Sequence, residues 1–260
     1  MIDPLMFIAL LPAVVLVVYI CRKDRTDKEP PALIAKLLGY GVLSCLPAIV
    51  VELILSAIIE RLNVRNVYLG YFLEAFVVAG LTEETCKFLF LRTTWRSPAF
   101  DYQFDAIVYA VMVALGFAAF ENVKYVYSYG FATGIVRAVT AVPGHAIFGV
   151  FMGYFYGYAK LSDYWGRDDD RKAYLALSVV VPVLMHGCYD YLAFTQESDS
   201  RFTLLFYAYL VALYVFGIRR VNRSSRDDRR VTRETVFDYF RRMQYPMPPQ
   251  YRDRDDDFWR

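Results

Sequence analysis

The sequence VVAGLTEETCKFLFL, residues 77–91, places three ionisable side chains inside an apolar segment. Glu83, Glu84 and Lys87 lie within five consecutive positions, and the residues around them are those of a membrane-spanning helix. A charged side chain at the centre of a bilayer costs ~2.5–3.5 kcal/mol on insertion scales. If this segment crosses a membrane, other membrane helices must therefore supply polar partners for the three groups.

The rest of the chain is typical of a polytopic membrane protein. Its 260 residues are 57% hydrophobic and 17% aromatic, with a mean hydropathy of +0.29. The apolar residues form long blocks, whereas most basic residues lie in short loops and in the tail after residue 217. This uneven charge indicates membrane topology and does not favour binding to nucleic acid.

Seven segments are apolar and long enough to cross a bilayer as helices. They run over about 4–21, 33–59, 69–95, 104–127, 135–160, 173–194 and 202–218. We therefore predict an all-α, polytopic bundle of about seven transmembrane helices. The first segment has no basic residue before it and no small-residue cleavage site after it, so we expect a retained anchor.

The positions of the basic residues predict the orientation of the chain. With the N-terminus outside, the outer loops contain only Arg61, Arg65 and Arg201, and the remaining loops contain most of the lysines and arginines. Because basic loops stay on the cytoplasmic side, this pattern predicts an outer N-terminus and a cytoplasmic C-terminus.

The chain divides into a membrane domain and a tail. We assign residues 1–218 to the transmembrane domain and residues 219–260 to a basic cytoplasmic tail. Residues 231–243 have apolar side chains at helical spacing, which predicts an amphipathic helix that either lies on anionic lipid or is solvated. Residues 244–260 are rich in proline and charge, so we expect them to be disordered.

Other predicted spans also contain ionisable side chains, including both histidines of the chain. At a rise of 1.5 Å per residue, Glu84, Glu121, His145 and His186 lie at depths of about 18–25 Å from the cytoplasmic side. His186 and Asp190 are four residues apart and therefore share one face of their helix. Four helices thus contribute polar groups to one layer. This favours a functional site over a network that only specifies helix packing.

Spacing gives further expectations within the layer. Lys87 is three residues after Glu84 and four after Glu83, so it can pair with either. Adjacent positions point ~100° apart around a helix, so we expect one glutamate to face inward and the other to bind Lys87 or a neighbouring helix. The carboxylates outnumber the cations, and protonation or a divalent metal would neutralise the excess.

Residues 149, 153 and 157 are glycines, which let another helix approach closely.

Four motifs on successive spans resemble those of the PrsW family of intramembrane proteases. In chain order, EETCK at 83–87 fits EExxK, FENVKY at 120–125 fits FExxxY, GHAIFG at 144–149 supplies a membrane histidine, and HGCYD at 186–190 fits HxxxD. The block FDAIVYAVMVALGFAAFEN is also similar to a membrane segment of that family. The resemblance covers about residues 81–192, and the first two spans and the tail match only in general character.

The resemblance implies an intramembrane endopeptidase in the plasma membrane of a prokaryote, distantly related to the CAAX prenyl proteases. It implies that a membrane-anchored protein of the anti-sigma-factor type is cleaved at site 1. Glu83 would activate the water, and Glu84 would assist it or hold Lys87.

The same resemblance implies roles for the remaining polar residues of the layer. His145 and His186 would stabilise the oxyanion or carry a proton to the leaving amine, with Asp190 orienting His186. Glu121 belongs to the candidate catalytic set without an assigned role.

We expect catalysis without a cofactor, by a glutamate-activated water. The alternative is a zinc-dependent protease in which the metal is held by Glu121, His145, His186 and Asp190, although no HExxH motif is present. Two non-proteolytic alternatives are a membrane scaffold or immunity-type protein and a transporter or proton relay. The expected partners are the membrane-anchored substrate and the lipid bilayer.

Overall fold

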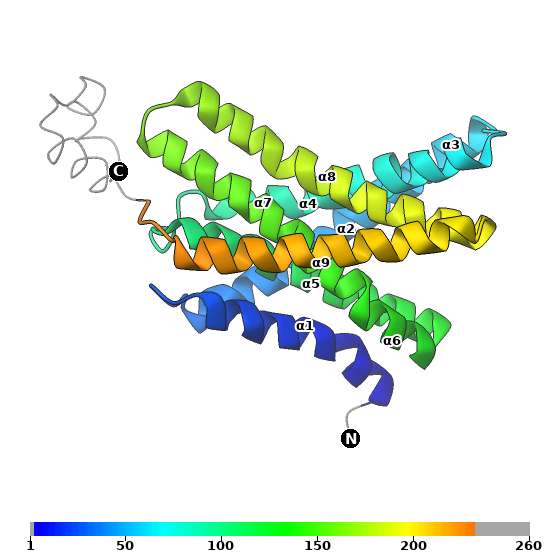
Figure 1. Cartoon of the computed structure of the whole chain (residues 1–260), viewed down its shortest axis with the longest axis horizontal. Helices are drawn as coiled ribbons and strands as arrows, with labels where there is room; N and C mark the ends of the chain where they lie inside the picture. Colours follow the sequence, from blue (N-terminus) through cyan, green and yellow to red (C-terminus); the bar gives the residue numbers. More distant parts are fainter. Residues whose placement is uncertain (1–2, 232–260) are drawn as a thin grey trace, which may run out of the picture.

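The computed structural model describes residues 3–231, with the backbone alone at Glu197, and this part of the chain is mostly helical. The elements are α1 Pro4–Lys23, α2 Pro31–Arg61, α3 Val67–Phe72, η1 Leu73–Leu81, α4 Thr82–Leu91, η2 Arg92–Thr94, α5 Gln103–Tyr129, α6 Phe131–Val139, α7 Ala141–Tyr164, α8 Asp168–Ser198 and α9 Arg201–Arg226. Long helices form an elongated bundle (Figure 1). The all-α prediction is confirmed for the described part, and the predicted tail elements beyond residue 231 lie outside it.

Six helices of the described chain are long and apolar enough to cross a membrane: α1, α2, α5, α6 together with α7, α8 and α9. The third predicted segment, residues 69–95, is helical from Val67 to Leu91 but is divided into α3, the π-helix η1 and α4. Each of these three is shorter than a bilayer-spanning helix. Six of the seven predicted segments therefore contain a helix of spanning length, and the third contains a run of shorter ones.

Helix α5 is the centre of the bundle. In its most apolar window 78% of the residues are buried, compared with 17% in α1 and 22% in α9. It contacts α1, α2, α4 and α7. The outer helices expose large apolar side chains, such as Leu53 and Leu204, of which 67% and 78% are accessible. An exterior of this kind suits a lipid environment, because lipid chains solvate apolar side chains.

Glycines let the backbones of neighbouring helices touch α5. A Cβ atom on Gly153 of α7 would lie 2.3 Å from the Ala106 carbonyl oxygen of α5. A Cβ on Gly116 of α5 would lie 2.1 Å from the Leu38 carbonyl oxygen of α2. The predicted role of the α7 glycines in close packing is therefore confirmed, and the partner is α5.

A second close contact aligns the π-helix with α8. A Cβ on Gly187 of α8 would lie 2.3 Å from the Phe76 ring, and one on Gly80 would lie 3.1 Å from the Val183 carbonyl oxygen. The π-helix widens the turn directly before α4, since its hydrogen bonds reach five residues back. This packing brings the first turn of α4 against the middle of α8, where His186 lies.

Candidate active site

The first turn of α4 carries Glu83 and Glu84, and both are buried in the centre of the bundle. Lys87, one turn later, places its ammonium nitrogen Nζ 3.1 Å from Glu83 Oε2 and 2.7 Å from Glu84 Oε1. The same nitrogen is 4.0 Å from the centroid of the Phe117 ring. The spacing predicts that one glutamate faces inward and the other binds Lys87 or a neighbouring helix. Instead, the lysine lies between the two carboxylates and pairs with both.

Helix α8 closes the site from the opposite side. His186 Nδ1 is 2.9 Å from Glu84 Oε1 and 3.9 Å from Glu83 Oε2, while its Nε2 is 3.2 Å from Asp190 Oδ2. The expected pairing along α8 is therefore present. The imidazole stacks on Phe148, with ring centroids 5.0 Å apart. These contacts hold the His186 ring in one orientation, with Nδ1 facing the two glutamates.

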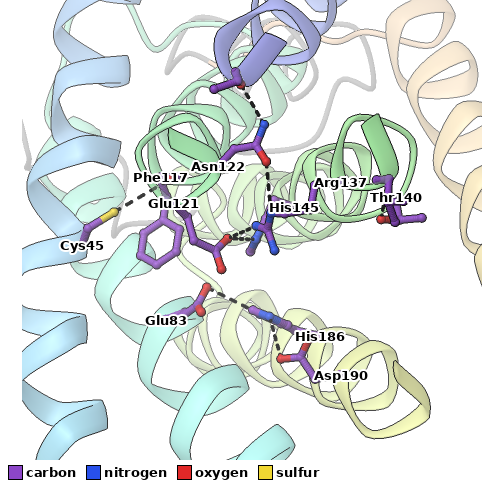
Figure 2. A network of polar contacts seen from close by, with 12 residues as sticks. Cys45, Glu83, Phe117, Glu121, Asn122, Arg137, Thr140, His145, His186 and Asp190 are labelled. Atoms are coloured by element: carbon purple, nitrogen blue, oxygen red, sulfur yellow. Dashed lines mark hydrogen bonds and ion pairs between the residues drawn. The ribbon is translucent and has the colours of Figure 1, made fainter. Parts of the chain in front are cut away.

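His145 of α7 connects the glutamates of α4 to α5. Its Nδ1 is 3.1 Å from Lys87 Nζ, and its Nε2 is 2.9 Å from Glu121 Oε2. The His145 ring also meets the His186 ring edge to face, with centroids 5.1 Å apart. All six predicted residues and Lys87 thus belong to one continuous network, much of which is drawn in Figure 2.

Two further residues extend this network, and the sequence analysis missed both. Arg137 of α6 donates from Nη2 to Glu121 Oε2 at 2.8 Å and from Nε to Asn122 Oδ1 at 3.0 Å. Asn122 in turn donates to the Ala9 carbonyl oxygen of α1 at 2.8 Å (Figure 2). The available signal was the arginine itself, because a cation inside an apolar segment needs an anionic partner.

The formal charges of the network do not balance. Glu83, Glu84, Glu121 and Asp190 supply four carboxylates, whereas Lys87 and Arg137 supply two cations. Charges removed from water need close compensation, because burying an unpaired charge costs several kcal/mol. Two further positive charges, from protons on the histidines or carboxylates or from a divalent cation, would complete the neutralisation.

Four side chains of the site offer donor atoms that suit a metal ion. Glu83, Glu84, His145 and His186 each offer one ligand atom, and these four atoms lie within 4.8 Å of one another. Glu84 Oε2 is buried and has no hydrogen-bond partner in the described part of the chain. Two imidazole nitrogens and two carboxylate oxygens are a donor set that zinc accepts. The residues therefore fit a metal by type and proximity, although the Lys87 ammonium contacts three of them.

This group differs from the ligand set suggested by the sequence. It shares His145 and His186 with that set but contains the two glutamates of α4 in place of Glu121 and Asp190. The difference arises because Glu121 contacts the outer nitrogen of His145, and Asp190 contacts the outer nitrogen of His186. Both carboxylates therefore stand behind the histidines, in the positions of orienting groups.

Comparison with known proteins gives consistent matches over most of the chain. A family described as "PrsW family intramembrane metalloprotease" matches residues 29–218. Protease PrsW of Bacillus subtilis (strain 168) is 34% identical over 214 residues, which cover 82% of this chain and 92% of the relative. Protease PrsW of Oceanobacillus iheyensis is 35% identical over 215 residues, covering 82% and 93%. That of Clostridioides difficile (strain 630) is 28% identical over 232 residues, covering 87% and 94%.

The matched region is wider than the resemblance expected from the motifs, because it starts at residue 29 and includes α2 and the part of α9 up to residue 218. It contains every residue of the network except Ala9. No solved structure matches the chain.

Proposed function

This chain belongs to the PrsW family of intramembrane proteases, and from that premise we propose that it cleaves a membrane-anchored protein by using Glu83 to activate a water molecule. The protein is a protease and a multi-pass protein of the plasma membrane. The observation that carries the mechanism is the burial of Glu83, Glu84, His145 and His186 around the Lys87 ammonium.

Differences in exposure favour Glu83 over Glu84 as the general base. The Glu83 side chain is 9% accessible and the Glu84 side chain is fully buried. Glu84 Oε1 also receives both Lys87 and His186, so that carboxylate is engaged in holding its neighbours. A base must reach a water molecule beside the scissile carbonyl, and Glu83 satisfies this requirement better.

The reaction assigns a proton path to the surrounding groups. Glu83 takes a proton from water as the oxygen attacks the peptide carbonyl carbon, which forms the new C–O bond. The oxyanion is stabilised by the Lys87 ammonium and by a protonated imidazole. When the C–N bond breaks, the proton held by Glu83 passes to the leaving nitrogen, directly or through His186. Asp190 holds the far side of His186, and Glu121 with Arg137 holds the far side of His145.

A zinc-dependent mechanism is the second candidate, supported by the description of the matching family as metalloproteases and by the four-residue group. Glu83, Glu84, His145 and His186 would hold the metal. When bound, such an ion supplies Lewis-acid activation of water and of the carbonyl. Metal content of the purified full chain, with cleavage measured after chelation and after zinc is restored, distinguishes the candidates. Metal-free protein that cleaves at the full rate supports glutamate catalysis, and activity that follows zinc content supports the metalloprotease.

The proposed topology has seven spans, with an outer N-terminus and a cytoplasmic C-terminus, and the third span is formed by α3, η1 and α4. Two contacts support an odd number. Lys23 Nζ donates to Asn222 Oδ1 at 2.6 Å, and Ser225 donates to the Lys23 carbonyl oxygen. The C-terminal ends of α1 and α9 therefore lie together, and the two helices run in the same direction (Figure 1). When the first and the last span cross the membrane in the same direction, the total number of spans is odd.

The proposed substrate is a single-span protein of the anti-sigma-factor type, and the test is cleavage by the purified full chain in proteoliposomes. We expect wild-type protein to cut such a substrate and His186→Ala to lose cleavage, because the substitution removes the contact between α8 and Glu84. Cys188→Ala on the same helix is the matched control and should retain cleavage. A non-catalytic scaffold predicts no cleavage by folded wild-type protein in any substrate screen, and that result would contradict the proposal.

A further inference from the structure

A cavity of about 210 Å³ lies at the end of the bundle where α9 ends, remote from the polar network in the membrane centre. Its walls come from α5, α7, α9 and the segment that follows α9. The side chains that line this cavity include those of Tyr154, Tyr158, Arg220, Arg223, Ser224 and Arg229. None of them belongs to the candidate active site.

The arginines of this cavity are positioned to bind an anion. The Arg220 guanidinium carbon lies 4.0 Å from the centroid of the Tyr154 ring, so the stack fixes the guanidinium plane and leaves its N–H groups available. Arg223 makes one long contact, with its Nε 3.6 Å from Asp227 Oδ2. Within residues 3–231, no carboxylate forms an ion pair with Arg220 or Arg229.

The third arginine, Arg229, is held at the cavity by hydrogen bonds between its chain segment and the start of α5. The amide of Gln103, at the start of α5, donates to the Arg229 carbonyl oxygen at 2.8 Å. The next amide, of Phe104, donates to Asp228 Oδ1 at 2.9 Å. The segment after α9 is therefore fixed to the first turn of α5. Because this wall of the cavity is already ordered before a ligand binds, less conformational entropy is lost on binding.

The charge of the lining selects the ligand. Three guanidinium groups face the cavity against a single lining carboxylate, that of Asp227, and the Ser224 hydroxyl adds a donor. Guanidinium groups match the geometry of phosphate oxygens and bind them through paired N–H donors. Basic pockets between membrane helices near the bilayer surface are the type of site that binds lipid phosphate groups. The position at the end of the spanning helix α9 agrees with that depth.

We propose that the cavity between α5, α7 and α9 binds a phosphate group, presented by an anionic phospholipid or as free phosphate. Tyr154 and Tyr158 form the apolar side of the cavity, which suits the glycerol portion of a lipid. Occupancy ties the ends of α5, α7 and α9 together through one ligand. The site is independent of the catalytic proposal.

The test is lipid binding by the full chain, purified in detergent and measured by native mass spectrometry. Phosphatidylglycerol is compared with dioleoylglycerol, which lacks the phosphate. We expect retention of phosphatidylglycerol alone, and about tenfold weaker binding for Arg220→Gln and Arg223→Gln, since each removes a charge-assisted contact. Arg219→Gln is the matched control, because Arg219 is exposed and does not line the cavity.

Two further arms of the experiment complete the test. Arg220→Gln removes the stack on Tyr154 and can thereby disturb the fold. The Arg223 side chain is 71% exposed, so Arg223→Gln tests the site without this risk. Displacement of the lipid by inorganic phosphate supports free phosphate as a ligand, and persistence of the lipid supports the phospholipid. Equal retention of both lipids, or binding by Arg223→Gln equal to that of Arg219→Gln, overturns the proposal.

Discussion

The middle of the bundle and the end at which α1 turns into α2 both bury carboxylates, but they compensate the charge differently. In the middle, Glu84 and Glu121 have a cation at 2.7 Å and 2.8 Å. At the end, Asp24 is 3% exposed and forms no ion pair within residues 3–231. The chain therefore pairs its buried carboxylates with cations where chemistry is proposed, and leaves a buried acid without an ion pair near the membrane surface.

The acids at that end are shifted toward their protonated forms by burial. Burial raises the pKa of Asp24 to about 6, opposed mainly by a hydrogen bond from the Glu29 backbone, while the neighbouring charge of Asp228 adds to the increase. Burial likewise raises the pKa of Glu29 to about 7. The two regions therefore predict different responses to substitution and to pH.

The largest effect on stability is expected from Lys87→Met. The substitution leaves Glu83 and Glu84 side by side without their shared cation, and breaking a buried pair in this way costs ~3–5 kcal/mol. Thermal unfolding of the full chain in detergent, at a fixed heating rate, measures the loss. Lys36→Met, on the exposed side of α2, is the matched control and should unfold like wild type. An unchanged unfolding temperature for Lys87→Met would show that the pairing in the middle does not stabilise the fold.

A smaller effect on cleavage is expected from Arg137→Gln, which tests the outer part of the network. Glu121 would keep His145 as a partner but lose the guanidinium at 2.8 Å. An unsatisfied buried group costs ~1–3 kcal/mol, so we expect the cleavage rate to fall by about tenfold at saturating substrate, with KM little changed. Arg137→Lys should restore part of the rate.

The control for Arg137 is Arg65→Gln in the loop before α3, where the side chain is exposed. Two results would contradict this role of the Arg137 charge in positioning Glu121 and His145. One is a rise in KM with an unchanged rate at saturating substrate, and the other is a rate for Arg137→Lys as low as that for Arg137→Gln.

The smallest effect is a pH dependence at the α1–α2 end. The folded-state pKa values of Asp24 and Glu29 lie above the ordinary values of ~4, so the folded protein holds more protons than the unfolded chain in this range. The contribution of these two acids to stability is therefore greatest below pH ~4 and is lost as the pH rises through about 6 and 7.

Unfolding temperatures between pH 5 and pH 8 check this slope, and Asp24→Asn should flatten it. Asp169→Asn, at an exposed position of α8, should leave the slope unchanged. Equal slopes in wild type and Asp24→Asn would show that the unpaired acid does not titrate in this range.

The polar residues in the middle of the bundle could be predicted from the sequence, whereas the buried acid at the α1–α2 end could not. The residues of the middle stand out because ionisable side chains are costly in apolar segments, so Glu83, Glu84, His145 and His186 were found with Lys87. Asp24 could not be recognised, since charged residues are expected in a loop between spans. Its burial depends on packing against distant parts of the chain.

Other features required the three-dimensional arrangement. Arg137 lies in a segment predicted as one span, but the chain breaks between α6 and α7 at Thr140, which has φ −122° and ψ −74°. The break lets α6 place its arginine beside Glu121. The π-helix η1 has the same apolar composition as an α-helix, so no pattern distinguished it. The placing of Glu121 and Asp190 behind the histidines followed only from distances.

The single-turnover cleavage rate of Glu83→Gln in proteoliposomes shows whether Glu83 activates the water molecule. Glu74→Gln is the matched control, because Glu74 lies in the same helical run but contacts Ser56 instead of the network. We predict that Glu83→Gln lowers the rate by ~10²–10⁴, the contribution of a general base, while Glu74→Gln stays close to wild type. Cleavage by folded Glu83→Gln at the wild-type rate would contradict the account.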